Sequence, residues 1–298
     1  MSTEASTPPE NSTAPAPEAN YRFDEAPDDT RAPFRRCQPG YTRVRMLIEY
    51  DGTDFCGWQR QNTNKTNSVQ GNIETAVSKM AGEFVRVLGA SRTDAGVHAR
   101  GQSAHFDFPK PVEGFDMRYA LQGMTSRDLT IREMYVTPYD FHAIALVTDK
   151  IYKYRVLNRK IPSALLKRYV HWVRHPLDID HLNASAKFLL GKQDFKAFQT
   201  NGTVVKTTVR TMTEAKWERL DDDILEFTIR GDGFLKQMVR TIVGTCIELN
   251  QYDRAPEKMS EIIATLDRRK AGPSAPAQGL FLERVNYPES VDKECRRL

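Results

Sequence analysis

One short loop concentrates side chains that could do chemistry. Residues 89–101, which begin and end with glycine, hold the carboxylate of Asp94, the guanidinium groups of Arg92 and Arg100, and the imidazole of His98. A carboxylate in such a loop can act as a nucleophile or stabilise a positive charge that develops on a sugar. The alternative is a hairpin loop in which aspartate and glycine only shape a turn, and spacing alone favours that alternative.

A second candidate is the tyrosine pair of residues 150–155. In a strand, Tyr152 and Tyr154 would point to the same face, where their rings could stack a nucleobase. The alternative is a pair of amphipathic core tyrosines, which the pattern alone favours. The pattern does not choose between the two rings.

Further candidates lie in a helix and in a loop. In a helix, Arg240 would lie about 200° from Met238, away from the main apolar face. It would then face solvent, the commoner case, or a cleft, where it would hold a neighbouring carboxylate ionised. In the loop of residues 55–61, Trp58 and Arg60 could contact RNA, although a buried Trp58 is the favoured interpretation.

The sequence predicts neither a metal site nor a bound cofactor. The glycines fit neither a phosphate-binding loop nor a dinucleotide fingerprint. The four cysteines form no C-x-x-C pair, and a disulfide framework is improbable in a chain of 298 residues, so we infer a reducing compartment. Three histidines lack metal-ligand spacing, and we interpret them as single, partly buried side chains: His98, His105 and His142.

Hydrophobic spacing predicts the elements that must position these residues. The first half is expected to hold strands at 43–50, 84–88, 104–108 and 129–136, and helices at 69–80 and 115–124. The second half is expected to hold strands at 151–157, 209–217, 224–229 and 279–285, and helices that begin at Asp178 or Asp180, span 234–249, and run from Pro256 to Leu266. Both halves follow the order βαββαβ, apart from one extra helix in the second.

The repeated order predicts an α+β fold of two ferredoxin-like halves, whose antiparallel sheets flank a basic cleft. We expect an N-terminal domain at residues 41–147, which carries the Asp94 loop, and a C-terminal domain at 148–290. Residues 291–298 are expected to be a tail. Residues 1–40 are expected to be a disordered acidic tail, because six of the sixteen prolines lie in residues 1–36 among small polar residues.

Charge and hydropathy narrow the class of protein. The total charge is +4, and residues 1–36 hold seven acids and four arginines, so the remaining residues carry +7. A basic body is compatible with a polyanionic partner. No stretch approaches the roughly 18 apolar residues of a membrane span. We therefore expect no membrane partner and a cytoplasmic protein, or a nuclear one in a eukaryotic cell.

Several motifs, in order, resemble the TruA family of tRNA pseudouridine synthases. The most specific is Arg-Thr-Asp-Ala-Gly-Val-His-Ala at residues 92–99, followed by Gly101-Gln102. Other similar segments fall at residues 49–52, 57–61, 68–70, 198, 238–240, 242–244 and 279–280. The resemblance runs from about residue 43 to residue 287 and overturns the structural alternatives preferred above.

The resemblance implies a role for each candidate. Asp94 would be the catalytic aspartate, Arg240 its ion-pair partner, and Tyr152 a ring that stacks on the target base and accepts a proton. Arg92 would help hold the place of the flipped nucleotide in the stem. The implied partner is tRNA, bound by a homodimer across a basic cleft and modified at uridines 38, 39 and 40 of the anticodon arm. The isomerisation involves no redox change, so no cofactor is implied.

One position departs from the family pattern. The family often has Phe-His-Ala-Arg-Phe where this chain has Ile144 in Phe-His-Ala-Ile-Ala. The missing arginine keeps open a pseudouridine synthase of broader RNA specificity. A non-catalytic RNA-binding module is another alternative, since it would not need the Asp94 loop. A hydrolase with an aspartate nucleophile would need a second carboxylate or a metal, and the sequence places neither close to Asp94.

Overall fold

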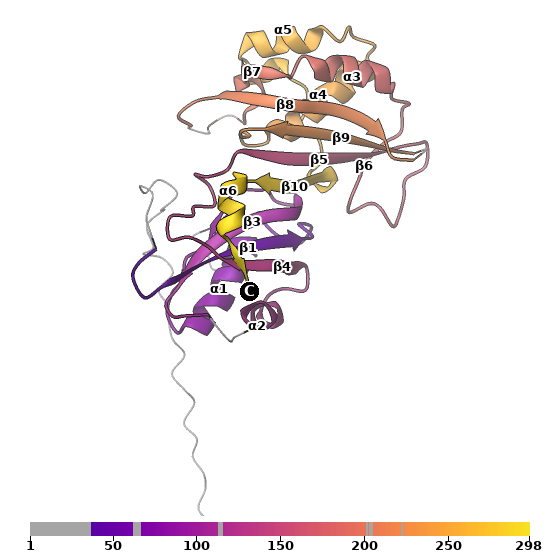
Figure 1. Cartoon of the computed structure of the whole chain (residues 1–298). Helices are drawn as coiled ribbons and strands as arrows, with labels where there is room; N and C mark the ends of the chain where they lie inside the picture. Colours follow the sequence, from indigo (N-terminus) through magenta and orange to yellow (C-terminus); the bar gives the residue numbers. More distant parts are fainter. Residues whose placement is uncertain (1–36, 62–66, 113–115, 201, 203–204, 222) are drawn as a thin grey trace, which may run out of the picture.

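One mostly antiparallel sheet runs through the molecule, as Figure 1 shows. Its strands follow the order β11-β4-β1-β3-β10-β5-β9-β8-β7, with β2 beside β3 and β6 beside β5. This computed structural model describes residues 37–61, 67–112, 116–200, 202, 205–221 and 223–298. Most of the expected N-terminal tail, residues 1–36, lies outside the described residues.

The described residues of the first half of the chain form four strands and two helices. Its elements are β1 (Thr42–Tyr50), α1 (Val69–Ala81), β2 (Leu88–Gly89), β3 (His98–Phe108), α2 (Met117–Met124) and β4 (Leu129–Val136). Strand β1 is central and pairs antiparallel with both β3 and β4. Its alternating residues Val44, Met46 and Ile48 are fully buried, as their spacing predicts. Helix α1 begins where the Ser68 hydroxyl accepts the Gly71 N–H.

The second half of the chain adds four helices to its strands. Its strands are β5 (Asp149–Asn158), β6 (His171–Val173), β7 (Gly191–Asp194), β8 (Val209–Arg219), β9 (Ile224–Gly231), β10 (Leu280–Asn286) and β11 (Arg296–Arg297). Its helices are α3 (Ile179–Lys187), α4 (Met238–Gln251), α5 (Lys258–Thr265) and α6 (Glu289–Glu294). Helices α3, α4 and α5 lie beside β7, β8 and β9 in the upper part of Figure 1. No helix in the described part of the chain is long and apolar enough to cross a membrane.

Strand β10 joins the two halves into one sheet. It pairs antiparallel with β5 along most of its length, and parallel with β3 at Phe281↔His98 and Leu282↔Ala99. The close approach requires glycine at position 101, since a Cβ there would lie 2.4 Å from the Glu283 carbonyl oxygen. The loop before β3 is thereby held beside β5.

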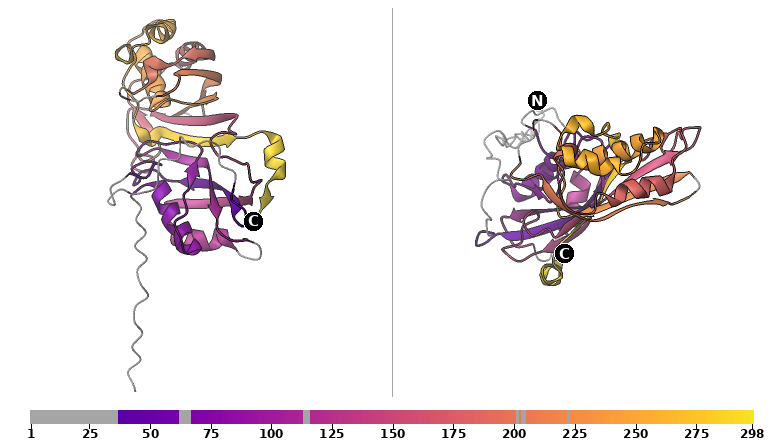
Figure 2. Two further views of the ribbon diagram at one scale, coloured as in Figure 1. Left: turned by 90° about the vertical axis from the view of Figure 1, so that its left-hand side faces the viewer. Right: turned by 90° about the horizontal axis from the view of Figure 1, so that it is seen from above.

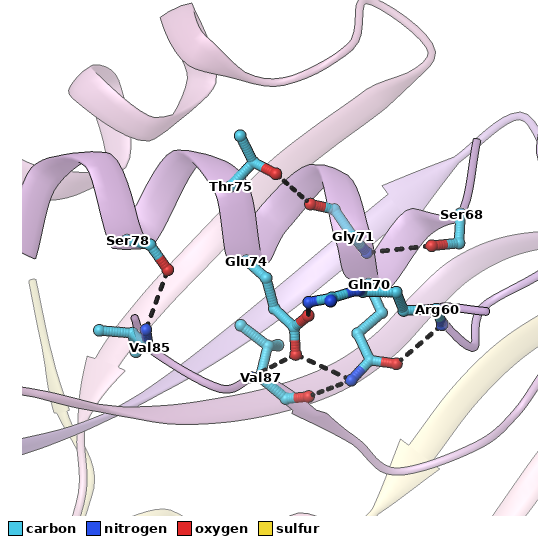
Figure 3. Close-up of polar contacts among 9 residues, drawn as sticks. All are labelled: Arg60, Ser68, Gln70, Gly71, Glu74, Thr75, Ser78, Val85 and Val87. Carbon is cyan, nitrogen blue, oxygen red and sulfur yellow. Dashed lines mark hydrogen bonds and ion pairs between the residues drawn. The ribbon is translucent and has the colours of Figure 1, made fainter. Parts of the chain in front are cut away.

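The strand expected at 84–88 is reduced to two residues for a local reason. The Val85 N–H donates to the Ser78 hydroxyl (2.9 Å), and the Val87 N–H donates to the Glu74 carboxylate (3.1 Å). Figure 3 shows both acceptors on α1. Because the Val85 and Val87 amide groups bond to side chains of α1, pairing with β3 begins only at Leu88.

Two other features differ from the expectation. Helix α4 begins at Met238 rather than at residue 234, after Gln237 in a left-handed conformation (φ 59°). The residues expected as a C-terminal tail form most of α6 and β11, and β11 pairs with β4 of the first half. Figure 2 shows α6 on the side of the sheet away from α5. The apolar pattern gave no signal for either element because both are short and none of their residues is buried.

Candidate active site

The Asp94 loop connects β2 to β3 and is fixed by residues on both sides of it. The Asp94 carbonyl accepts the Val97 N–H (3.2 Å), which closes a turn around the aspartate. The Thr93 carbonyl accepts the Trp58 N–H (3.0 Å), and the Thr93 hydroxyl lies 2.8 Å from the Tyr50 hydroxyl. The loop is therefore held by its backbone and by its neighbours, and the Asp94 side chain is left partly exposed.

Two glycines allow this close approach. Gly57 has φ +106°, and a Cβ there would lie 2.6 Å from the Thr93 carbonyl oxygen. A Cβ at Gly89 would lie 2.2 Å from the ring of Trp58. Trp58 is 2% exposed, so it is a core residue that supports the loop and not a free stacking surface.

An arginine from α4 pairs with the aspartate. The Arg240 Nη1 lies 3.2 Å from Asp94 Oδ2, and the two side chains are 15% and 22% exposed. The Arg240 Nε donates to the Ala275 carbonyl (2.7 Å), and the Ala275 N–H donates back to the Arg240 carbonyl (2.9 Å). The guanidinium is thus anchored independently of Asp94. The sequence predicted that Arg240 would leave the apolar face, and the ion pair is consistent with that placement.

The tyrosine pair lies on one buried face of β5, which β10 separates from β3 in the sheet. The Tyr152 hydroxyl lies 2.8 Å from the Ser91 hydroxyl, three residues before Asp94. The Tyr154 hydroxyl instead donates to the Pro276 carbonyl (2.8 Å). Burial raises the pKa of Tyr152 to about 12, with Asp94 adding to the shift and the Ser91 hydrogen bond opposing it. Of the two rings, only Tyr152 contacts the Asp94 loop through its hydroxyl.

Ser91 is the centre of a set of contacts that the sequence did not reveal. The Gln102 side chain accepts the Ser91 N–H (3.3 Å) and donates to the Ser91 carbonyl (2.6 Å). The Lys150 ammonium donates to the Ala90 carbonyl (2.7 Å) and lies 3.4 Å from the Ser91 hydroxyl. Burial, with Arg210 nearby, lowers the pKa of Lys150 to about 8. The sequence did not indicate the contacts of Lys150 with Ala90 and Ser91, because about 60 residues of chain separate them.

The remaining candidates occupy other places. Arg92 is exposed at the edge of the loop, between buried Ser91 and Thr93. Arg60 pairs with the buried Glu74 of α1 (3.3 Å), as Figure 3 shows, so its charge is used inside the protein.

His98 is a structural residue beneath the loop. Its Nδ1 accepts the Gly52 N–H (3.0 Å) and lies 3.2 Å from Asp51 Oδ1, while Nε2 lies 2.9 Å from the Arg168 carbonyl. Because Nδ1 accepts a hydrogen bond, the proton of the neutral ring is on Nε2. Burial lowers the His98 pKa. Within the described residues, no group of three or more His, Cys, Asp or Glu side chains is arranged to hold a metal.

The geometry brings together a carboxylate, a guanidinium and a phenol from three elements. An ionised aspartate held by an arginine can attack an electrophilic carbon or stabilise a cationic sugar. The neighbouring Tyr152 ring is only 5% exposed, but it is an aromatic side chain of the kind on which planar bases stack. This combination suits chemistry at a nucleoside.

Comparisons with known proteins agree with this chemistry. A family profile described as tRNA pseudouridine synthase matches residues 46–143 and 185–288. A protein of Bdellovibrio bacteriovorus named tRNA pseudouridine synthase A is 47% identical over 260 residues, covering 86% of this chain and 99% of that protein. A protein of the same name from Acetivibrio thermocellus is 43% identical over 244 residues, covering 82% and 99%. Together, the profile and these relatives show that the chain belongs to the tRNA pseudouridine synthase family.

Proposed function

We propose that this chain converts uridine to pseudouridine in tRNA, at positions 38–40 of the anticodon stem-loop, with Asp94 as the catalytic carboxylate. The observation that carries the proposal is the Asp94–Arg240 ion pair next to Tyr152 in a chain of this family. The reaction breaks the C–N glycosidic bond and rejoins the same uracil through carbon. Reaction and binding are assigned to the side chains of this protein and to no cofactor.

The contacts of Asp94 support its role. Arg240 is anchored by Ala275, so it fixes the direction in which the Asp94 carboxylate points. An ionised, partly exposed carboxylate can attack as a nucleophile or stabilise positive charge on the ribose. Arg240 therefore acts on Asp94 as a positioning partner.

The target base must leave its stack, which costs a few kcal/mol. Stacking on an aromatic ring returns about 1–3 kcal/mol. Tyr152 is 5% exposed and meets Phe234 edge to face at 5.0 Å, so an entering base must open this contact. A phenol with a raised pKa is protonated at neutral pH, which supports stacking by Tyr152 rather than action as a phenolate base. Arg92, exposed on the same loop, is proposed to hold the vacated place in the stem.

The wider proposal concerns fold and assembly. We interpret the strand orders β4-β1-β3-β2 and β10-β5-β9-β8 as two ferredoxin-like domains, at residues 41–147 and 148–290, that flank a basic cleft for RNA. We propose a homodimer in the cytoplasm. The net charge of +7 outside residues 1–36 supports binding of a polyanion.

The test compares Asp94→Asn with a matched change at Asp54, an exposed aspartate of a nearby loop. We expect Asp94→Asn to bind unmodified tRNA within about twofold of wild type and to release no tritium from 5-tritiated uridine. Asp54→Asn should behave as wild type in both assays. Tritium release by Asp94→Asn at the wild-type rate would remove Asp94 from the chemistry.

The same assays address the alternatives. A non-catalytic RNA-binding module would give wild-type protein that binds tRNA and releases no tritium. Ile144 is 39% exposed where the family often has arginine, which is the observation behind broader RNA specificity. Mapping pseudouridine in total RNA treated with wild type and with Ile144→Arg tests it, because a narrower set of sites in the variant is expected.

A further inference from the structure

Lys150 is an ammonium group without a carboxylate partner among the described residues. Its Nζ makes its two contacts with the Ala90 carbonyl and the Ser91 hydroxyl. The acid next to it in the chain, Asp149, faces the other way and pairs with Arg230 (2.8 Å). A neutral amide could make the same two contacts with the loop, so the positive charge itself calls for an explanation.

A second cation lies near the first. Lys150 pairs with Gly231 of β9, which pairs in turn with Met212 of β8, and Arg210 lies two residues before Met212. The Arg210 Nη1 donates to the carbonyls of Thr207 (2.9 Å) and Val209 (2.6 Å). Across the described parts of the chain, Arg210 also has no ion pair with an acid.

Two neighbouring cations without an acid are unfavourable unless an anion joins them. Burial lowers the pKa of Lys150, and repulsion from Arg210 lowers it further. A bound anion would reverse this effect and hold both groups charged. The arrangement is therefore that of a site whose charge is balanced by a ligand.

The position of Lys150 next to the Asp94 loop indicates which anion the two cations would bind. Ser91 contacts both the Lys150 ammonium and the Tyr152 hydroxyl, and Asp94 follows three residues later. A nucleotide that presents its base to Tyr152 and its ribose to Asp94 carries a phosphate on each side. We propose that Lys150 and Arg210 form a subsite for one backbone phosphate next to the target uridine. This inference rests on the proposed function and adds to it the contact that holds the nucleotide's backbone.

The experiment uses full-length protein and a tRNA assembled with a single uncharged methylphosphonate linkage on either side of the target uridine. On unmodified tRNA, Lys150→Gln and Arg210→Gln should each weaken binding about tenfold and lower the slope of log affinity against log salt by about 0.7–1. Lys216→Gln is the matched control, since Lys216 is an exposed β8 cation that Glu218 already neutralises. Its binding and slope should equal those of wild type.

The neutral linkage completes a thermodynamic cycle. On the tRNA that lacks the contacted phosphate, wild type, Lys150→Gln and Arg210→Gln should bind equally, within about twofold. Wild-type binding and salt slope in both variants on unmodified tRNA would overturn the subsite, even if turnover fell, because Lys150 would then only position the loop. A binding loss that persists on both neutral-linkage tRNAs would overturn it as well. Turnover by wild type on unmodified tRNA tests the proposed function separately from the phosphate subsite.

Discussion

Substitution of Gly57 by alanine should misplace Asp94 without touching the chemistry of the site. Gly57 adopts φ +106°, which an alanine tolerates poorly, at a cost of about 1–2 kcal/mol. The added Cβ would also lie 2.6 Å from the Thr93 carbonyl oxygen and 3.1 Å from the Ala95 nitrogen. Ordinary contact begins near 3.4 Å, so the segment around Asp94 must move by several tenths of an ångström.

The expected loss combines two effects. Overpacking of a tight contact costs about 1–3 kcal/mol, which brings the total loss in unfolding free energy to about 2–5 kcal/mol. A displacement approaching 1 Å lowers turnover by about 10²-fold. We therefore expect Gly57→Ala to retain tRNA binding and to lose between tenfold and hundredfold in kcat.

Gly82→Ala provides the control for backbone strain. Gly82 ends α1 with φ +82°, and a Cβ there would meet nothing within 4 Å. It should lose about 1–2 kcal/mol in urea unfolding and keep wild-type kcat in the tritium-release assay. Equal kcat for the two variants below their unfolding transitions would refute the claim that Gly57 positions Asp94.

Three other predictions follow from the contacts described. Arg240→Met should lower kcat by at least about hundredfold and the unfolding free energy by about 1–3 kcal/mol. The loss is less than the roughly 3–5 kcal/mol of a fully buried pair because Asp94 keeps some access to water. Wild-type turnover in this variant would contradict the prediction. The pKa of Lys150 in the folded state (about 8) is below its unfolded value, so the unfolded chain binds more protons between pH 8 and 10.5. The unfolding free energy of wild type should therefore rise with pH across this range, by no more than about 3 kcal/mol. Urea titrations of Lys150→Gln should lack that rise. Glu74→Gln should lose about 1–3 kcal/mol near neutral pH, because an amide oxygen still accepts the Val87 N–H but the amide nitrogen cannot accept from Arg60; Glu74→Leu, which accepts neither bond, should lose more in the same assay.

Much of the fold follows from local patterns. Hydrophobic spacing predicted β1, β5 and β9, and it placed the start of α1 at residue 69. These predictions are confirmed because each depends on neighbours within one element. The strand expected at 84–88 was wrong in length because side chains of α1 took its amide groups, a contact that no local pattern contains.

The site was predictable only in part. The spacing of Arg240 indicated a position off the apolar face, while its pairing with Asp94 came from family resemblance and spans 146 residues of chain. Lys150 carried no signal, because its neighbours in the loop are defined by pairing through β10. The catalytic role of Asp94 and the roles of Tyr152 and Arg92 stay predictions until the variants are assayed.

The pairing of β10 has a consequence for how the protein is made. Both of its neighbours, β3 and β5, precede it in the chain, so during synthesis each presents an open edge until β10 emerges. The loop with the carboxylate and the strand with the phenol are therefore brought into register late, after nearly every other described strand has formed. Nascent chains would carry the reactive groups on separate, unjoined surfaces and gain activity only on closure of the sheet.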